Sequence, residues 1–65
     1  MAKMTLYGAR HNCKLSQKKA AEAIGVSVST IKNWENQKSF PSQPHIEKIC
    51  SVYGVEYDDL IFLPS

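Results

Sequence analysis

The sequence predicts an all-α protein built from five short helices. Apolar residues recur at the three- and four-residue intervals of an amphipathic helix, as at Ile46, Ile49 and Tyr53. Strand signals are weak, because no alternating apolar stretch is bounded by the dipeptides of a hairpin. The 65 residues leave room for one small domain, which we expect to span residues 1–65.

The first two helices are predicted over roughly Thr5–Cys13 and Gln17–Ile24. Ser16 precedes the second helix and is a good N-terminal cap, because its hydroxyl can accept a hydrogen bond from an otherwise unpaired amide. Gly25 follows the same helix and can take the left-handed conformation that commonly ends one.

Three further helices are expected in the rest of the chain. Ser27 is the predicted cap of a third helix, which runs to about Asn36. Ser42 marks the start of a fourth helix, and Gly54 closes it. A short acidic fifth helix is expected over about Tyr57–Phe62.

The composition excludes several classes of protein. Apolar residues make up 43% of the chain and charged residues 22%, as in an ordinary soluble domain. No apolar run approaches the roughly 20 residues of a membrane helix, and two cysteines cannot form a disulfide-dense scaffold. No nucleophile with a matching base and no metal-ligand spacing is apparent. We therefore expect a cytoplasmic protein that is not an enzyme and has no cofactor, no metal and no membrane partner.

Positive charge is concentrated in the first part of the chain. Residues 1–40 hold seven lysines and arginines against two glutamates, whereas residues 41–65 hold one lysine against four carboxylates. This asymmetry indicates that one face of the protein binds a polyanion, although solvated surface charge would give the same distribution.

The second and third helices together form a helix-turn-helix pattern over about residues 17–36. Ala21 is small enough for two helices to cross closely, and Gly25 is free to adopt positive φ in the short turn. Val26 can hold this turn against the core. The pattern is typical of DNA-binding proteins, in which the second helix of the unit enters the major groove.

The outer side of the third helix carries small polar groups. With Ile31 turned inward, the helical period places three residues roughly opposite it, with Val28 and Lys32 flanking them: Ser29, Asn33 and Asn36. A hydroxyl, an amide, an ammonium and a small apolar group match the base edges in the major groove of DNA. These residue types therefore predict that the third helix reads bases.

Four motifs follow one another along the chain: Leu15-Ser16-Gln17, Ile24-Gly25-Val26-Ser27, the stretch Ser29–Asn36, and Tyr53-Gly54-Val55 with Asp58-Asp59-Leu60-Ile61. In these motifs the chain resembles the phage Cro/repressor-type helix-turn-helix family over about residues 4–62. The resemblance implies a lambda-repressor-like DNA-binding domain. It also implies a sequence-specific transcriptional regulator of the phage or prophage repressor type, which acts on double-stranded DNA.

The resemblance further implies roles for individual residues. Base reading falls to Val28, Ser29, Lys32 and Asn33. Contacts with DNA phosphates fall to Gln17, Lys18, Ser27, Asn36 and Lys38. Arg10 and Glu35 match a structural pair that ties the first helix to the third. Gln37 stands where a glycine usually ends the recognition helix, so we expect that end to be strained or differently capped.

A homodimer on a palindromic operator is expected, because one small domain buries too little DNA surface for strong specificity. The candidate dimer surface is the apolar tail Leu60, Ile61, Phe62 and Leu63. The alternative arrangement is a monomer whose tail folds back over the first helix. The alternative function is an antitoxin or protein-interaction adaptor with the same fold, but the polar and basic third helix favours DNA.

Overall fold

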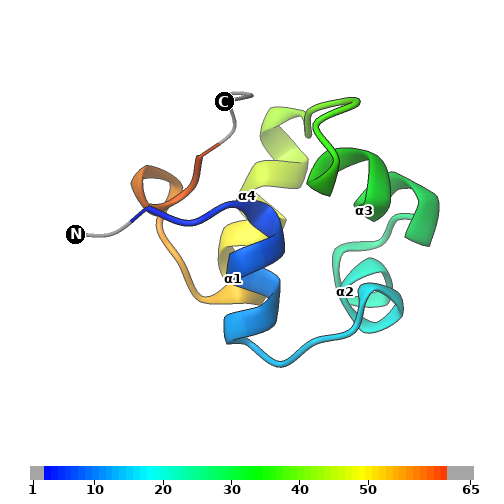
Figure 1. Ribbon diagram of the computed structural model, residues 1–65, viewed down its shortest axis with the longest axis horizontal. Coiled ribbons are helices and arrows are strands. Elements are labelled where there is room, and N and C mark those ends of the chain that lie inside the picture. Colours follow the sequence, from blue (N-terminus) through cyan, green and yellow to red (C-terminus); the bar gives the residue numbers. More distant parts are fainter. Residues whose placement is uncertain (1–2, 62–65) are drawn as a thin grey trace.

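The computed structural model describes residues 3–61 and is built from helices (Figure 1). The elements are α1 (Leu6–Asn12), α2 (Gln17–Ile24), α3 (Val28–Glu35), α4 (Gln43–Tyr53) and a single 3-10 turn, η1 (Tyr57–Asp59). Within residues 3–61, extended pairing is limited to one isolated bridge between Met4 and Leu60. The predicted all-α class is confirmed.

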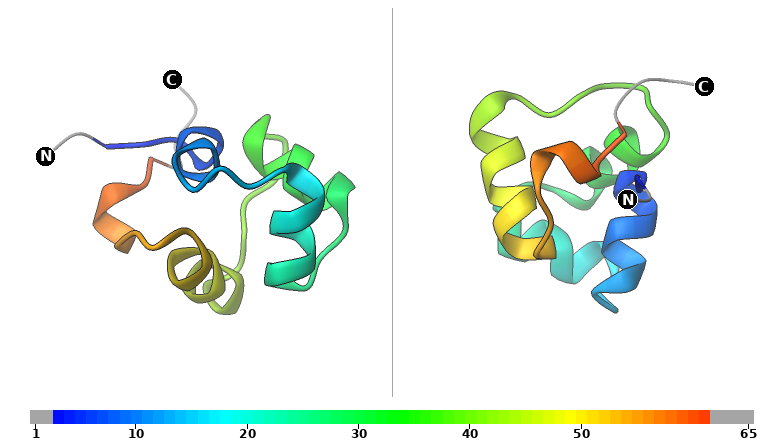
Figure 2. Two further views of the ribbon diagram at one scale, coloured as in Figure 1. Left: turned by 90° about the horizontal axis from the view of Figure 1, so that it is seen from below. Right: turned by 90° about the vertical axis from the view of Figure 1, so that its left-hand side faces the viewer.

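The helices pack around one apolar core. α2 packs on both α3 and α4, and α1 also packs on α3 and α4 (Figure 2). Ala20 and Ala21 are buried on α2, where their small side chains allow the neighbouring helices to approach closely. The other core residues are Leu6, Ala9, Ile24, Ile31, Trp34, Ile49, Tyr53 and Leu60. Burial raises the pKa of Tyr53 to about 12, so its phenol is protonated at neutral pH.

Three helices begin at a side chain that caps them. The hydroxyls of Thr5, Ser16 and Ser27 each accept a hydrogen bond from a backbone amide three residues later, at 3.0, 3.0 and 3.2 Å. The predicted caps at Ser16 and Ser27 are therefore confirmed. At the start of α4, the Ser42 hydroxyl lies instead 3.1 Å from Nδ1 of the His45 ring.

Each of the four α-helices is followed by a residue in the left-handed conformation. These residues are Lys14, Gly25, Gln37 and Gly54, with φ of 60°, 92°, 62° and 68°. In each case the amide of the next residue bonds back to a carbonyl in the last turn of the helix. Glycine adopts this conformation freely, whereas a Cβ atom crowds the following carbonyl. Of the two outcomes expected at Gln37, a different cap is not found: α3 ends in the same left-handed conformation as α2 and α4, with a side chain where they have glycine.

Replacing Gln37 with glycine is expected to stabilise the protein by about 1 kcal/mol. The left-handed conformation costs a residue with a side chain about 1–2 kcal/mol, and the greater freedom of glycine in the unfolded chain offsets part of this gain. Thermal unfolding followed by circular dichroism should show Tm raised by about 4–8 °C per kcal/mol.

The matched control is Ala23→Gly, which places a glycine on the exposed side of α2, where the backbone is right-handed. This variant should lose about 1 kcal/mol instead. An unchanged or lowered Tm for Gln37→Gly would show that the end of α3 holds no strain.

The fifth helix expected over about Tyr57–Phe62 is present only as the 3-10 turn η1 over Tyr57–Asp59, and Phe62 lies outside the described residues. η1 ends at Asp59, and the chain then runs extended through Leu60 beside Met4. Two backbone hydrogen bonds hold this pairing: the Met4 amide donates to the Asp59 carbonyl at 2.7 Å, and the Ile61 amide donates to the Met4 carbonyl at 2.8 Å. The extended form wins because the segment before α1 offers backbone partners that a free helix end would lack.

Candidate nucleic-acid interface

α2 and α3 are joined by a turn that gives little freedom to either helix. The amides of Gly25 and Val26 both donate to the Ala21 carbonyl, at 2.8 and 3.0 Å. Val26 is half-buried and packs against the core. The two helices consequently form the compact helix-turn-helix seen on the right of Figure 1.

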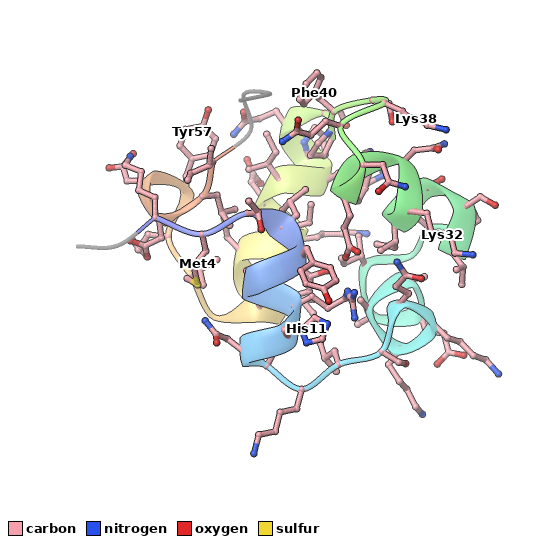
Figure 3. The ribbon with its side chains drawn as sticks, in the orientation of Figure 1. Met4, His11, Lys32, Lys38, Phe40 and Tyr57 are labelled. Carbon is pink, nitrogen blue, oxygen red and sulfur yellow. The ribbon has the colours of Figure 1, made fainter. Side chains whose placement is uncertain are left out.

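α3 has one buried and one exposed side. Ile31 is 1% exposed and Trp34 is 7% exposed, so both side chains hold the helix against the core. Ser29, Lys32 and Asn33 are exposed on the other side. Figure 3 shows Lys32 extending away from the body of the molecule. Three of the four predicted base-reading residues therefore share a surface open to a partner.

Val28, the fourth predicted base-reading residue, is half-buried, unlike the other three. It is the first residue of α3, and its side chain is half-buried against the core. The neighbouring hydroxyl of Ser27 is held by two groups, the Thr30 amide at 3.2 Å and the Thr30 hydroxyl at 3.0 Å. The start of α3 is thus fixed by its cap on one side and by apolar packing on the other.

A buried ion pair connects α1 to α3. Nε of Arg10 lies 2.6 Å from Oε2 of Glu35, and Nη2 of Arg10 donates to Oε1 of Glu35 at 3.1 Å. Their side chains are only 7% and 5% exposed. The hydrogen bond to Glu35 raises the pKa of Arg10, against an opposing effect of burial. The guanidinium is therefore charged, and its two-pronged geometry fixes the end of α3.

Two further contacts extend the ion pair into a network. Nη1 of Arg10 donates to the Leu15 carbonyl at 2.9 Å, and Nε2 of Gln17 donates to Oε1 of Glu35 at 3.1 Å. Gln17 is the first residue of α2, so the network joins α1, the start of α2 and the end of α3. The side chain of Gln17 therefore braces the end of α3.

An aromatic side chain that was not predicted from the sequence, Tyr7, lies against Arg10 of this network. The Tyr7 ring lies 5.3 Å from the Arg10 guanidinium carbon and 4.3 Å from the His11 ring. Its spacing of three and four residues from these partners on α1 is the signal that could have found it. The stack shields the Arg10 side of the ion pair.

The predicted phosphate-contacting residues lie around α3 rather than on it alone. Lys18 is exposed in the first turn of α2, and Ser27 is exposed at the start of α3. Asn36 and Lys38 are exposed where the chain leaves α3. Figure 3 shows Lys38 pointing outward on the same side of the molecule as Lys32.

Negative charge lies at the other end of the molecule. Glu56 and Asp58 are exposed at η1. Figure 1 and the left panel of Figure 2 show η1 and α3 at opposite ends of the long axis. Part of the charge asymmetry along the sequence is therefore also an asymmetry in space, with Lys32 and Lys38 at the α3 end and Glu56 and Asp58 at η1, while Glu22 is exposed on α2.

The residues of the predicted dimer surface do not all lie at the surface. Leu60 is 6% exposed and belongs to the core, because the extended pairing with Met4 turns it inward. Ile61 is 39% exposed and lines a shallow hollow together with Phe40, which is 53% exposed. Phe62 and Leu63 lie outside the described residues. The place of Phe40 in this surface was not predicted from the sequence, although an aromatic residue in a polar loop could have indicated it.

Within residues 3–61, no three histidine, cysteine, aspartate or glutamate side chains gather as a group that could hold a metal ion. In the same range, every helix is too short or too polar to cross a membrane.

The family comparison agrees with this geometry. The model of the helix-turn-helix family, of the Cro/C1 type, matches residues 6–60, which include all four α-helices and η1. A comparison with curated proteins and one with solved structures gave no match. The match confirms the resemblance found in the sequence. The chain therefore belongs to the Cro/C1-type helix-turn-helix family of DNA-binding regulators.

Proposed function

We propose that this protein is a sequence-specific transcriptional regulator of the phage or prophage repressor type, which places α3 in the major groove of an operator. The observation that carries the proposal is the two-sided character of α3: Ile31 and Trp34 are buried, while Ser29, Lys32 and Asn33 are exposed. The exposed side offers donors and acceptors that fit base edges. The regulator acts by occupying the operator, so its mechanism makes and breaks no covalent bond.

Contacts with phosphates position the domain in this proposal. Gln17 and Lys18 lie in the first turn of α2, where backbone amides lack helical partners and the helix dipole favours an anion. Lys18 and Lys38 are both exposed, and Ser27 and Asn36 flank the two ends of α3. Such contacts hold the register of the protein on DNA without reading sequence.

Alanine at Lys18, Lys32 or Lys38 is expected to weaken binding to random duplexes, and alanine at Lys32, which lies on the base-reading side of α3, should weaken operator binding further. Each true phosphate contact that is lost should reduce the slope of log affinity against log salt by roughly 1. The control is Lys3→Ala, because Lys3 is exposed and directly precedes Met4, which Figure 3 shows on the opposite side of the molecule from Lys32. Affinities measured by fluorescence anisotropy over a salt series give these slopes. Unchanged slopes for all three variants would refute the docking face.

The proposal includes a two-fold dimer on DNA, because two half-sites supply the buried surface that one domain lacks. Ile61 is the described residue of the apolar tail that remains exposed, and Phe62 and Leu63 follow it. A dimer through Ile61 would face the second copy with this side chain and with Phe40, which lines the same hollow. Leu60 takes no part in this surface, since it fills the core of its own protomer.

Ile61→Asp is expected to abolish self-association and to lower operator affinity about tenfold or more, with a smaller loss on random DNA. The matched control Ser51→Asp adds the same charge at an exposed position of α4 and should change neither property. Sedimentation, free and on the operator, measures the assembly directly. A monomer in both conditions would exclude the dimer.

Selection of bound sequences from a pool of random duplexes tests the proposed function. The expected result is an enriched motif with two related half-sites. An adaptor or antitoxin that has lost DNA binding would enrich nothing, and a protein that only senses phosphates would retain the whole pool without preference. Either of these results would overturn the proposal.

A further inference from the structure

The C-terminal end of α2 carries negative charge and no cation of its own. The last carbonyl groups of a helix lack partners within it, and the helix dipole gives this end a partial negative charge. The last turn of α2, residues 21–24, contains no basic residue, whereas it does contain the exposed carboxylate of Glu22. This end of α2 therefore attracts positive charge from elsewhere in the molecule.

A lysine from α4 lies at this end. Nζ of Lys48 is 3.9 Å from the position that a Cβ atom on Gly25 would occupy, and Gly25 is the left-handed residue that ends α2. α2 packs on α4, and Ile49, the neighbour of Lys48, is 1% exposed in the core. The ammonium of Lys48 therefore stands beside the α2–α3 turn, while its backbone is anchored by the packing of α4.

Lys48 has no carboxylate partner. It is the one lysine or arginine among residues 41–65, which also hold four carboxylates. Within residues 3–61, however, none of these carboxylates forms an ion pair with it, and Arg10–Glu35 is the one pair present. The end of α2 is therefore the negative group that the structure places beside this ammonium.

The turn beside Lys48 determines where α3 begins. The amides of Gly25 and Val26 both donate to the Ala21 carbonyl, and α3 starts three residues after Gly25, at Val28. A shift of the turn relative to α4 would therefore shift the start of α3. A binding site must be held to within about 0.5 Å of its productive geometry, so such a shift weakens specific binding more than it weakens attraction to phosphates.

Resting on the proposed function, we propose that Lys48 is a positioning residue for DNA binding. Its ammonium attracts the negative end of α2, holds the α2–α3 turn against α4 and so fixes the start of α3, while it contacts neither base nor phosphate. A cation at the end of a helix shifts an equilibrium that opens this end by about two- to fivefold. Its loss should lower the fraction of protein competent to bind the operator by the same factor.

The test is Lys48→Met, which keeps much of the length of the side chain but removes its charge. Lys48→Arg keeps the charge, and Lys48→Glu reverses it. Lys3→Met is the matched control, because it removes the same charge from an exposed residue that precedes α1. Thermal unfolding is followed for each variant. Dissociation constants for the selected operator and for a random duplex are measured well below Tm, over a salt series.

Lys48→Met should lower Tm by about 1–8 °C and weaken operator binding about two- to fivefold for each domain bound. Binding to the random duplex and the slope of log affinity against log salt should hardly change, because no phosphate contact is lost. Lys48→Arg should bind the operator nearly as the unaltered protein does, and Lys48→Glu should lose more affinity than Lys48→Met. Lys3→Met should retain both Tm and the preference for the operator.

Three results would overturn the inference while the proposed function stands. Unchanged operator affinity for Lys48→Met, whatever its Tm, would mean that Lys48 does not position α3. Equal losses on both duplexes, with the slope reduced by roughly 1, would mean that Lys48 contacts a phosphate. Equal losses for Lys48→Arg and Lys48→Met would mean that its charge has no part. Selection without any preferred sequence would instead sink the proposed function, and the positioning role with it.

Discussion

Replacing Arg10 with methionine is expected to cost about 3–5 kcal/mol of stability. The change leaves the Glu35 carboxylate, whose side chain is 5% exposed, without its guanidinium partner. A chain of 65 residues has a total stability of about 3–10 kcal/mol, so the variant loses much or all of its folded population. Denaturation by urea, followed by circular dichroism, measures the loss.

The control for this prediction removes both charges together. In Arg10→Met with Glu35→Leu, apolar side chains replace the pair, and stability should return to within about 1–2 kcal/mol of the unaltered protein. Lys18→Met serves as a surface control and should change stability by less than about 0.5 kcal/mol. If Arg10→Met alone costs under 1 kcal/mol, the ion pair does not hold α3 in place.

Asn33→Asp is expected to weaken binding to the operator by about a hundredfold or more. The substitution keeps the size of the side chain but replaces a hydrogen-bond donor with a negative charge, facing a polyanion. Juxtaposed like charges cost several kcal/mol at an interface. By comparison, Asn33→Ala should cost about 1–3 kcal/mol and relax the preference at one position of each half-site.

The matched control is Asn12→Asp, which makes the same chemical change at an exposed position of α1, outside the helix-turn-helix. Anisotropy at a fixed salt concentration should show nearly unchanged affinity for this variant. Equal losses for the two substitutions would mean that net charge, and not the position of Asn33 in the groove, determines the effect.

Local signals predicted most of the helices. The hydroxyls of Ser16 and Ser27 act as caps, and Gly25 takes the positive φ expected of it, because each of these properties depends on a few neighbouring residues. The tail could not be predicted in this way. A run of consecutive apolar residues fits a helix or an extended segment equally well, and the choice depends on Met4, which lies far away in the sequence.

In the candidate site, too, local patterns predict some features and miss others. The exposure of Ser29 and Asn33 follows from the helical period and the inward direction of Ile31. The hydrogen bond from Gln17 to Glu35 joins residues 18 positions apart, and no local pattern indicates its geometry. Such contacts depend on how the helices pack, so a local pattern does not indicate them, and the Arg10–Glu35 pair was expected only through the resemblance to the helix-turn-helix family.

The most direct test of the account compares two duplexes of the same composition, the selected operator and a scrambled version of it. Dissociation constants for both are measured with the unaltered protein at physiological salt. If α3 reads base edges, the operator should bind about a thousandfold more tightly than the scrambled duplex, or better. Equal affinities would contradict the account, since they would mean that the protein senses only the phosphate backbone.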